Sequence, residues 1–285
     1  MSQAVTNTSP AGPTKSAAGK SARRSHLGRA AVVAGSAAAL TIGLTGSASA
    51  SILTPFPYLG NGAPKQEMFQ PLFDYDSDSC FPAAAVDARG RLNGGLNNSG
   101  SITGGCRTNH LGKANTYSRA KCDKGSGWCA VVYTLYMEKD QGNAVLDIGH
   151  RHEWEAAVVW YHGNDEWPSY VSTSAHGNYT TKRFNDVERV GKRFKVVYHK
   201  EGEFGTHSFR FAKVGEKAEA WGGDNWDRPA LVPYDTLWSK NRTAFNALAN
   251  SDWGQANFPL QDKNDRFRST LNKAKPSGIG FNAWS

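Results

Sequence analysis

AVVYTLYM (residues 130–137) and AAVVWY (residues 156–161) are runs of mostly β-branched and aromatic residues near the middle of the chain. Two similar runs follow, FKVVY at residues 194–198 and SFRFA at residues 208–212. Clusters of Gly, Asn, Asp and Pro separate the four runs, and such clusters mark turns between strands. No long helical pattern lies between the runs. The sequence therefore predicts a mainly β fold in which antiparallel sheets pack as a sandwich.

Helical patterns occur only near the C-terminus. Asp235 is a candidate N-cap for a helix that reaches residue 250, and its apolar residues share one face: Leu237, Ala244, Phe245 and Leu248. A shorter helix is predicted at residues 262–274, where Phe267 and Leu271 are spaced i, i+4. We therefore expect helices that flank the β-sandwich rather than alternate with its strands.

The first fifty residues have the pattern of an export signal. They contain no Asp or Glu and five basic residues, Lys15, Lys20, Arg23, Arg24 and Arg29. An apolar stretch at residues 30–44 follows, and Ala48-Ser49-Ala50 supplies the small residues that signal peptidase requires. The arginine pair indicates twin-arginine export, with the ordinary Sec route as the alternative. We predict a signal peptide at residues 1–50, a single domain at residues 51–285, and secretion.

The charge of the chain depends on that segment. The 285 residues include 33 Lys and Arg and 25 Asp and Glu, a formal net charge of +8 that is typical of nucleic-acid-binding proteins. Without the five basic residues of the signal, 28 basic residues remain against 25 acidic ones, a net charge of +3. We therefore expect no nucleic-acid partner. With 39% hydrophobic residues the chain has material for a core, which excludes a fully disordered protein.

The cysteines fit an extracellular protein. Cys80, Cys106, Cys122 and Cys129 form an even set, for which three pairings are possible. Sequence order favours Cys80–Cys106, which would close a loop rich in Gly, Asn and Ser, and Cys122–Cys129, which would close a tight turn. Closing the larger loop is worth roughly 3–4 kcal/mol. A zinc site is the alternative, but there is no Cys-x2-Cys pair, and we expect two disulfides.

The segment GHRHEWE at residues 149–155 places two imidazoles and two carboxylates within seven residues. Because side chains alternate along a strand, His150 and His152 are expected on one face, and Glu153 and Glu155 on the other. One cation reaches all of them only if the backbone turns here or if other ligands come from elsewhere. Such donors suit Mg²⁺, Ca²⁺ or Mn²⁺. The alternative is an exposed polar loop with salt bridges.

GHRHEWE resembles the heptapeptide GHRHDWE of the necrosis- and ethylene-inducing-peptide-like proteins, a family of secreted microbial cytolysins. Further segments resemble the same family: YMEKD (136–140), SAHG (174–177), VYH (197–199), Thr206-His207, LVPYD (231–235) and GQANFP (254–259). In the N-terminal half the similar positions are Cys80, Ala85-Val86-Asp87, Gly94-Gly95 and Cys106. The resemblance covers about residues 60–275, and Cys122 with GWCA (127–130) resembles the four-cysteine subgroup.

This resemblance implies a single β-sandwich domain with flanking helices, similar to the actinoporins of sea anemones and to fungal lectins. It implies a cytolysin rather than an enzyme. Such a protein binds glycosylated inositol-phosphoceramide sphingolipids of the plant plasma membrane through a cation-containing acidic cavity, permeabilises the membrane and induces necrosis. The implied partners are glycosphingolipid headgroups reached by peripheral membrane contact, and we expect a monomer.

The resemblance also implies roles for individual residues. The cation and cavity residues are Asp140, His150, Glu153 and Glu155, with Mg²⁺ as the expected ion and Ca²⁺ or Mn²⁺ as alternatives. His176 and His207 are expected to line the same cavity and to receive the sugar headgroup. Glu153 departs from the usual Asp of the motif by one methylene, which affects how the ion is held.

The other motif residues, Gly149, Arg151, His152 and Trp154, have less specific roles. Trp154 is expected in the core beneath the cavity, with sugar stacking as its alternative role. Arg151 and Arg183 are candidates for contact with a lipid phosphate. Two other functions stay open: a non-cytolytic elicitor or lectin-like glycan binder, and a metal-dependent glycan-cleaving enzyme with Glu153 or Glu155 as general base.

Overall fold

The computed structural model describes residues 51–146 and 148–285, so the predicted signal peptide lies outside the described residues. The strands are β1 (Leu72–Tyr75), β2 (Asn115–Cys122), β3 (Trp128–Gln141), β4 (Gly149–His162), β5 (Tyr170–Ala175), β6 (Asn178–Arg183), β7 (Arg189–Val190), β8 (Arg193–Lys200), β9 (His207–Phe211) and β10 (Ala230–Pro233). The α-helices are α1 (Pro64–Phe69), α2 (Tyr234–Lys240), α3 (Arg242–Asn250) and α4 (Arg266–Ala274), with 3₁₀ turns at Phe184–Asp186 and Lys263–Asp265.

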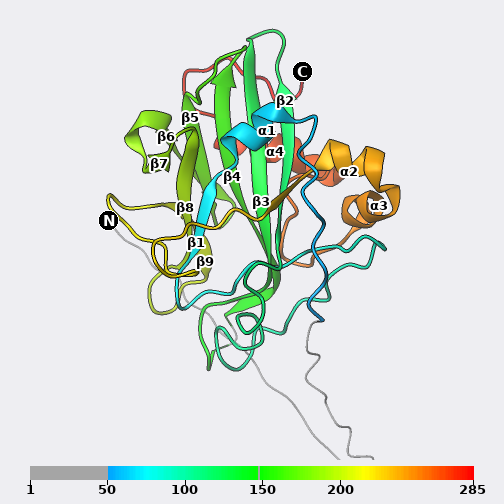
Figure 1. Ribbon diagram of the computed structural model, residues 1–285, viewed down its shortest axis with the longest axis vertical. Helices are drawn as coiled ribbons and strands as arrows, with labels where there is room; N and C mark the ends of the chain where they lie inside the picture. The colour runs from blue at the N-terminus through cyan, green and yellow to red at the C-terminus, as the bar shows by residue number, and fades with distance from the viewer. Residues whose placement is uncertain (1–50, 147) are drawn as a thin grey trace, which may run out of the picture. The chain divides into compact units, whose positions relative to one another are not determined.

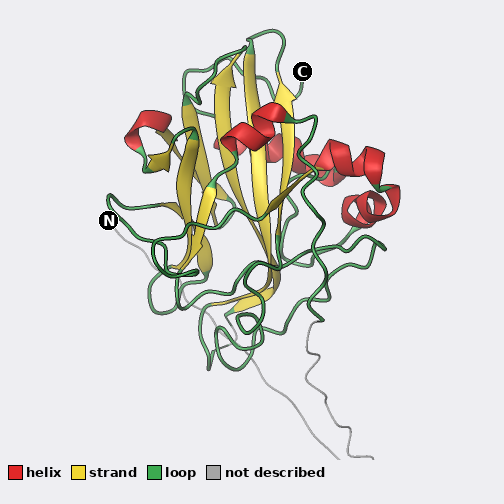
Figure 2. Ribbon diagram, viewed as in Figure 1, coloured by secondary structure: helices red, strands yellow, loops and turns green. Residues whose placement is uncertain are grey.

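The strands form two sheets. One has six strands in the order β10-β2-β3-β4-β5-β6, and the other contains β1, β8, β7 and β9, with β8 pairing to all three others. One face of β3 and β4 packs on the smaller sheet through residues such as Tyr133, Val159 and Val196. The opposite face packs against the helices through Trp160, Leu237 and Leu271. The expected β-sandwich with flanking helices is confirmed (Figures 1 and 2).

The sheets are mixed rather than purely antiparallel. β1 runs parallel to β8, and β10 runs parallel to β2, whereas the other strand pairs are antiparallel. The prediction of antiparallel sheets is therefore wrong at these two pairs. Each parallel pair joins segments that are more than a hundred residues apart, so no hairpin turn sets their relative direction.

The β3–β4 hairpin is longer than its apolar runs indicated. Each strand has fourteen residues, and β3 continues past Met137 through Glu138, Lys139 and Asp140, all of which are buried. This polar extension pairs with the heptapeptide, with Asp140 opposite His150. Apolar patterning ended the predicted strands too early because the extension buries polar groups. The consequence is that the heptapeptide forms the first half of β4.

The predicted helix at residues 235–250 is two helices. The backbone leaves the helical conformation at Asn241, whose side chain accepts a hydrogen bond from the N–H of Ala244 at 3.0 Å and thereby caps α3. Asp235 lies in the first turn of α2 and is not its N-cap. The second predicted helix is confirmed as α4, although a 3₁₀ turn replaces its first residues.

Both expected disulfides are confirmed. Cys80 bonds to Cys106, and Cys122 bonds to Cys129 across the β2–β3 hairpin, where the two residues are directly paired. The alternative of a zinc site on these cysteines is excluded, since no free cysteine exists in the described chain.

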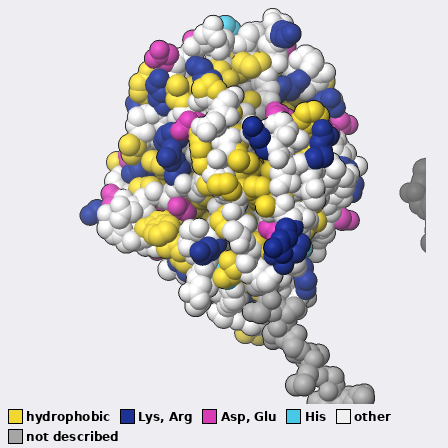
Figure 3. Space-filling model, turned by 45° about the vertical axis from the view of Figure 1, so that its right-hand side comes forward, with side chains coloured by type: hydrophobic (Ala, Val, Ile, Leu, Met, Phe, Trp, Pro, Cys, Tyr) yellow, Lys and Arg dark blue, Asp and Glu magenta, His cyan; other side chains and the backbone are white. Residues whose placement is uncertain are grey.

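On the face drawn in Figure 3, Lys and Arg side chains are distributed among hydrophobic and neutral ones rather than gathered in one basic patch. None of the helices within the described residues has the length and hydropathy needed to cross a bilayer.

Candidate functional site

A cavity of about 550 Å³ lies where the β3–β4 hairpin, the β5–β6 turn and the C-terminal segment meet. Its lining includes Asp140, His150, Glu153 and Glu155 from the hairpin, and Arg266 and Lys273 from α4. This volume falls within the range of ~300–1,000 Å³ that is typical of small-ligand sites. The hairpin therefore contributes acidic groups to the cavity, and α4 contributes basic groups.

A backbone turn at His152 brings the acidic wall together. His152 has a φ of 64°, in the left-handed region, and this breaks the alternation of side chains along β4. His150 consequently lies beside Glu153, with 3.4 Å between Nε2 and Oε2. The predicted separation of His150 from Glu153 onto opposite faces is thus wrong, because the strand turns between them.

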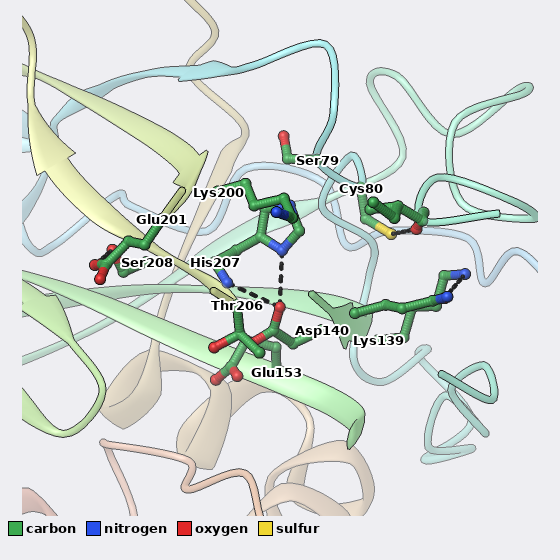
Figure 4. Close-up of polar contacts among 12 residues, drawn as sticks. Ser79, Cys80, Lys139, Asp140, Glu153, Lys200, Glu201, Thr206, His207 and Ser208 are labelled. Atoms are coloured by element: carbon green, nitrogen blue, oxygen red, sulfur yellow. Dashed lines mark hydrogen bonds and ion pairs between the residues drawn. The ribbon is translucent and has the colours of Figure 1, made fainter. Parts of the chain in front are cut away.

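Asp140, His150 and Glu153 each present a ligand atom within 4.8 Å of the other two. The backbone N–H of His207 donates to Oδ1 of Asp140 at 2.9 Å, and the ring Nδ1 lies 2.8 Å from the same oxygen (Figure 4). His207 itself is buried, stacks on Tyr198 and does not line the cavity. The prediction that His207 lines the cavity is wrong. His207 instead binds the Asp140 carboxylate through its backbone N–H and its ring.

The electrostatics of this wall suit a cation. Burial raises the pKa of Glu153 well above its usual range, and the charges of Glu155 and Asp140 raise it further. Burial likewise raises the pKa of Glu155. A divalent cation supplies the positive charge that these crowded carboxylates need, and two carboxylates with one imidazole form a ligand set for a hard divalent ion. The residues present therefore fit a bound cation.

Glu155 lines the cavity but lies outside the group of three. The hydroxyl of Ser174 donates to its Oε2, and the same hydroxyl accepts the N–H of Ala156 at 2.7 Å. The structure thus brings together three of the four predicted cation ligands and places the fourth beside them. Ser174 belongs to the SAHG segment (174–177), but the sequence did not predict its contact with Glu155.

The other two aromatic residues of the motif pack against core residues, and Trp154 also lines the cavity. Burial, Arg151 and His150 lower the pKa of His152 to about 4, and its Nδ1 makes a hydrogen bond with the Tyr136 hydroxyl at 2.6 Å. Trp154 is buried and its ring contacts Tyr136 at a centroid distance of 5.1 Å. Trp154 therefore lies in the core beside the cavity, and sugar stacking stays its alternative role.

The loop at residues 93–110, called the glycine loop here, packs directly onto the motif. Gly95 has a φ of 65°, and a Cβ there would lie 2.7 Å from the His152 ring. Arg151 donates to the carbonyl of Gly94 at 3.1 Å and to Oδ1 of Asn97. The Arg151 guanidinium is therefore hydrogen-bonded to the glycine loop. Neither Arg151 nor Arg183 lines the cavity.

His176 lines the cavity as expected. It lies in the β5–β6 turn with a φ of 50°, and its Nε2 is 3.1 Å from Oε2 of Glu201. The sequence did not predict the contribution of α4 to the cavity, because Arg266 and Lys273 belong to no motif and reach the cavity only through the fold.

Comparison with known proteins identifies this arrangement. The family model described as necrosis inducing protein (NPP1) matches residues 64–274. NLP effector protein 10 of Phytophthora capsici is 34% identical over 203 residues, which cover 70% of this chain and 77% of that protein.

Solved structures of proteins from this family also match the chain. NLPPya in complex with mannosamine matches with a TM-score of 0.64 at 27% identity, covering 78% of this chain and 95% of that chain. NLPPya in complex with glucosamine matches with a TM-score of 0.63 at the same identity and coverage. The non-toxic HaNLP3 protein matches with a TM-score of 0.64 at 27% identity, covering 80% of this chain and 99% of that chain. The heptapeptide, the fold and these matches agree, and the chain belongs to the necrosis-inducing protein (NPP1) family.

Proposed function

We propose that this protein is a secreted cytolysin that binds glycosylated inositol-phosphoceramide headgroups of the plant plasma membrane and permeabilises that membrane. The cavity is the headgroup site, and a divalent cation, Mg²⁺ first, is held there by Asp140, His150 and Glu153. The bound cation supplies a positive centre that accepts ligation from sugar hydroxyls. The cavity of about 550 Å³ beside this group of three is the observation that carries the proposal.

The relatives support a saccharide ligand. NLPPya has been solved in complex with mannosamine and with glucosamine, and its chain superposes on the domain that contains this cavity. Ser174, Thr270 and Asn257 also line the cavity and offer hydroxyl and amide groups of the kind that bind sugars.

Two loops near the cation residues offer a membrane contact. The β3–β4 loop exposes Val145 and Leu146, and the β8–β9 loop exposes Phe204. The loops lie side by side, because a Cβ at Gly142 would be 2.8 Å from the carbonyl oxygen of Gly205. Exposed apolar side chains beside a headgroup site favour insertion into the interface of a lipid bilayer.

Leakage from dye-loaded vesicles containing plant glycosylated inositol-phosphoceramide tests the proposal. In excess Mg²⁺, Glu153→Gln is expected to lower the leakage rate at least ~10-fold, because it removes one anionic ligand of the cation. The melting temperature of Glu153→Gln should change little, because the substitution removes a carboxylate that is repelled by Glu155 and Asp140. Glu166→Gln is the matched control, because its side chain is 80% exposed and lies beyond the opposite end of β4. Wild-type leakage that persists in EDTA would contradict the proposal.

A non-cytolytic glycan binder is the second candidate, because the non-toxic HaNLP3 protein has the same fold. Vesicle binding without leakage, together with the absence of cell death after leaf infiltration, would favour it. A glycan-cleaving enzyme is distinguished by product release from the same sphingolipid glycans, which the cytolysin does not cause.

A further inference from the structure

Trp221 differs from the other exposed tryptophans of the described chain. Four tryptophans are between 47% and 56% exposed: Trp167, Trp221, Trp238 and Trp284. Three of them have a cation over the ring: Lys192 over Trp167, Arg242 over Trp238 and Arg268 over Trp284. Within the described residues no cation lies over Trp221. Its ring is therefore the one exposed indole that the chain itself does not cover with a charged group.

The exposure of Trp221 does not serve the only polar atom of its side chain. Burial raises the pKa of Asp227, and hydrogen bonds from the Tyr75 hydroxyl and the Trp221 indole oppose that rise. The indole N–H is thus directed toward a carboxylate that is only 9% exposed. What Trp221 presents to solvent is the apolar part of its ring, and an exposed apolar ring with a satisfied N–H is suited to stacking on a ligand.

The loop that carries Trp221 is anchored to the smaller sheet. Asp74 of β1 is fully buried, and its Oδ1 accepts the backbone N–H of Glu219 at 2.9 Å and that of Ala220 at 3.1 Å. The ring also lies against the backbone at Gly112, where a Cβ would be 3.2 Å from Cη2 of Trp221. Trp221 is therefore positioned before a ligand arrives, which lowers the entropic cost of binding.

The surroundings of Trp221 favour a neutral sugar as the ligand. The next four residues are Gly-Gly-Asp-Asn (222–225), so the ring does not belong to an apolar run of the kind that a bilayer or a protein partner covers. Lys113 and Glu219 flank the two segments that meet here, and they are exposed and of opposite charge. An apolar ring bordered by polar groups without net charge matches a pyranose, which offers C–H groups to the ring and hydroxyls to its border.

We propose that Trp221 is the platform of a second saccharide site, which binds the pyranose rings of an uncharged polysaccharide. The site lies on the loop between β9 and β10 and shares no residue with the lining of the cavity. It goes beyond the proposed function, because it needs no cation and leaves the cavity free for a lipid headgroup. A protein held by this loop on a polysaccharide surface keeps its membrane site available.

Affinity electrophoresis of the mature protein tests the site. Native gels contain hydroxyethylcellulose, xyloglucan or galactomannan, with excess EDTA so that a cation in the cavity does not contribute. At least one polysaccharide is expected to retard the wild type. Trp221→Ala should weaken that binding about 10-fold, because the stacking surface is lost. Trp221→Phe should retain part of the affinity, since a smaller ring remains, and it tests the site even if Trp221→Ala is unstable.

Trp238→Ala is the matched control. Trp238 is as exposed as Trp221, but the Arg242 guanidinium lies 3.9 Å from the centre of its ring. The control should be retarded like the wild type. Equal loss of retardation in Trp221→Ala and Trp238→Ala would show nonspecific adhesion through exposed aromatic rings and overturn the proposal. Absence of retardation by all three polysaccharides would overturn it as well.

Two further measurements separate this site from the cavity and from self-association. Vesicle leakage by Trp221→Ala should equal that of the wild type, because the cation residues and the apolar loops are unchanged. Retardation that requires Mg²⁺ and is lost in Glu153→Gln would place the polysaccharide in the cavity and overturn the inference while leaving the proposed function intact. A dimer in sedimentation experiments that Trp221→Ala abolishes would mean that a second copy covers the ring, and it would also overturn the inference.

Discussion

Gly149 is the residue whose backbone conformation allows Asp140 and the heptapeptide to approach each other. Its φ is 118°, and a Cβ at this position would collide with the carbonyl oxygen of Asp140. Because Gly149 begins β4 next to Asp140, a larger residue displaces the end of β4 that carries His150, a proposed cation ligand. The geometry of the cation group therefore depends on a residue with no side chain.

Replacing Gly149 by Ala is expected to lower the free energy of unfolding by at least ~2 kcal/mol, through positive-φ strain and the collision. It should also weaken Mn²⁺ binding, measured by electron paramagnetic resonance, at least ~10-fold. Gly163→Ala is the control, since Gly163 has a φ of 53° but open space around its Cβ. Equal effects in both variants would show that only backbone strain matters.

At the scale of elements, the polar end of β3 anchors the glycine loop that covers the motif. Glu138 is fully buried, and its carboxylate accepts from Asn93 at 3.0 Å and lies 2.9 Å from Nε2 of His110. Its backbone carbonyl accepts the N–H of Leu96 at 2.7 Å. One strand residue thus holds three points of the loop in place.

This anchor predicts a pH dependence. Burial by itself lowers the pKa of His110, but hydrogen bonds to Glu138 and to the Thr108 carbonyl raise it above the usual 6.5. His110 therefore contributes stability that is complete below pH 6.5 and is lost as the pH rises through the folded-state pKa.

Chemical unfolding of His110→Gln should show a loss of about 1–3 kcal/mol at pH 6, and the gap to wild type should narrow toward pH 9. His162→Gln is the control, because it changes an exposed histidine at the C-terminal end of β4. The difference between its unfolding free energy and that of the wild type should not change with pH. If the difference in unfolding free energy between His110→Gln and wild type widened as the pH rises, the stabilising role assigned to the protonated His110 would be wrong.

At the scale of the whole molecule, the cavity proposed for headgroup binding and the loops proposed for membrane contact are neighbours. The cation residues lie at the base of the β3–β4 loop, and the exposed Leu146 lies on that loop, while Phe204 lies on the adjacent one. A lipid whose headgroup enters the cavity therefore brings its bilayer toward both loops.

Phe204→Ser is expected to reduce leakage from sphingolipid vesicles about 10-fold while leaving sugar affinity unchanged, because only apolar burial in the bilayer is lost. Val214→Ser is the control, since Val214 is 93% exposed and lies on another loop. Undiminished leakage in Phe204→Ser would remove this loop from the membrane contact.

The accuracy of the sequence predictions depended on the range of the interactions involved. The apolar runs located parts of four strands correctly, because alternation and β-branched composition are local properties. The same rule missed the polar end of β3, where Glu138 and Lys139 are buried through partners on a distant loop. The predicted helix at residues 235–250 is divided at Asn241, because the Asn241 side chain caps α3. The apolar periodicity of the sequence does not reveal such a cap.

The sequence by itself determined the core-forming strands, the two disulfides and the set of donor groups in the heptapeptide. Only the tertiary structure decided which donors meet. The left-handed turn at His152 brings His150 beside Glu153. His207 contacts Asp140 from the other sheet, and α4 brings Arg266 into the lining of the cavity. Local composition sets what each segment can form, whereas contacts between segments far apart in the chain depend on packing that no local pattern records.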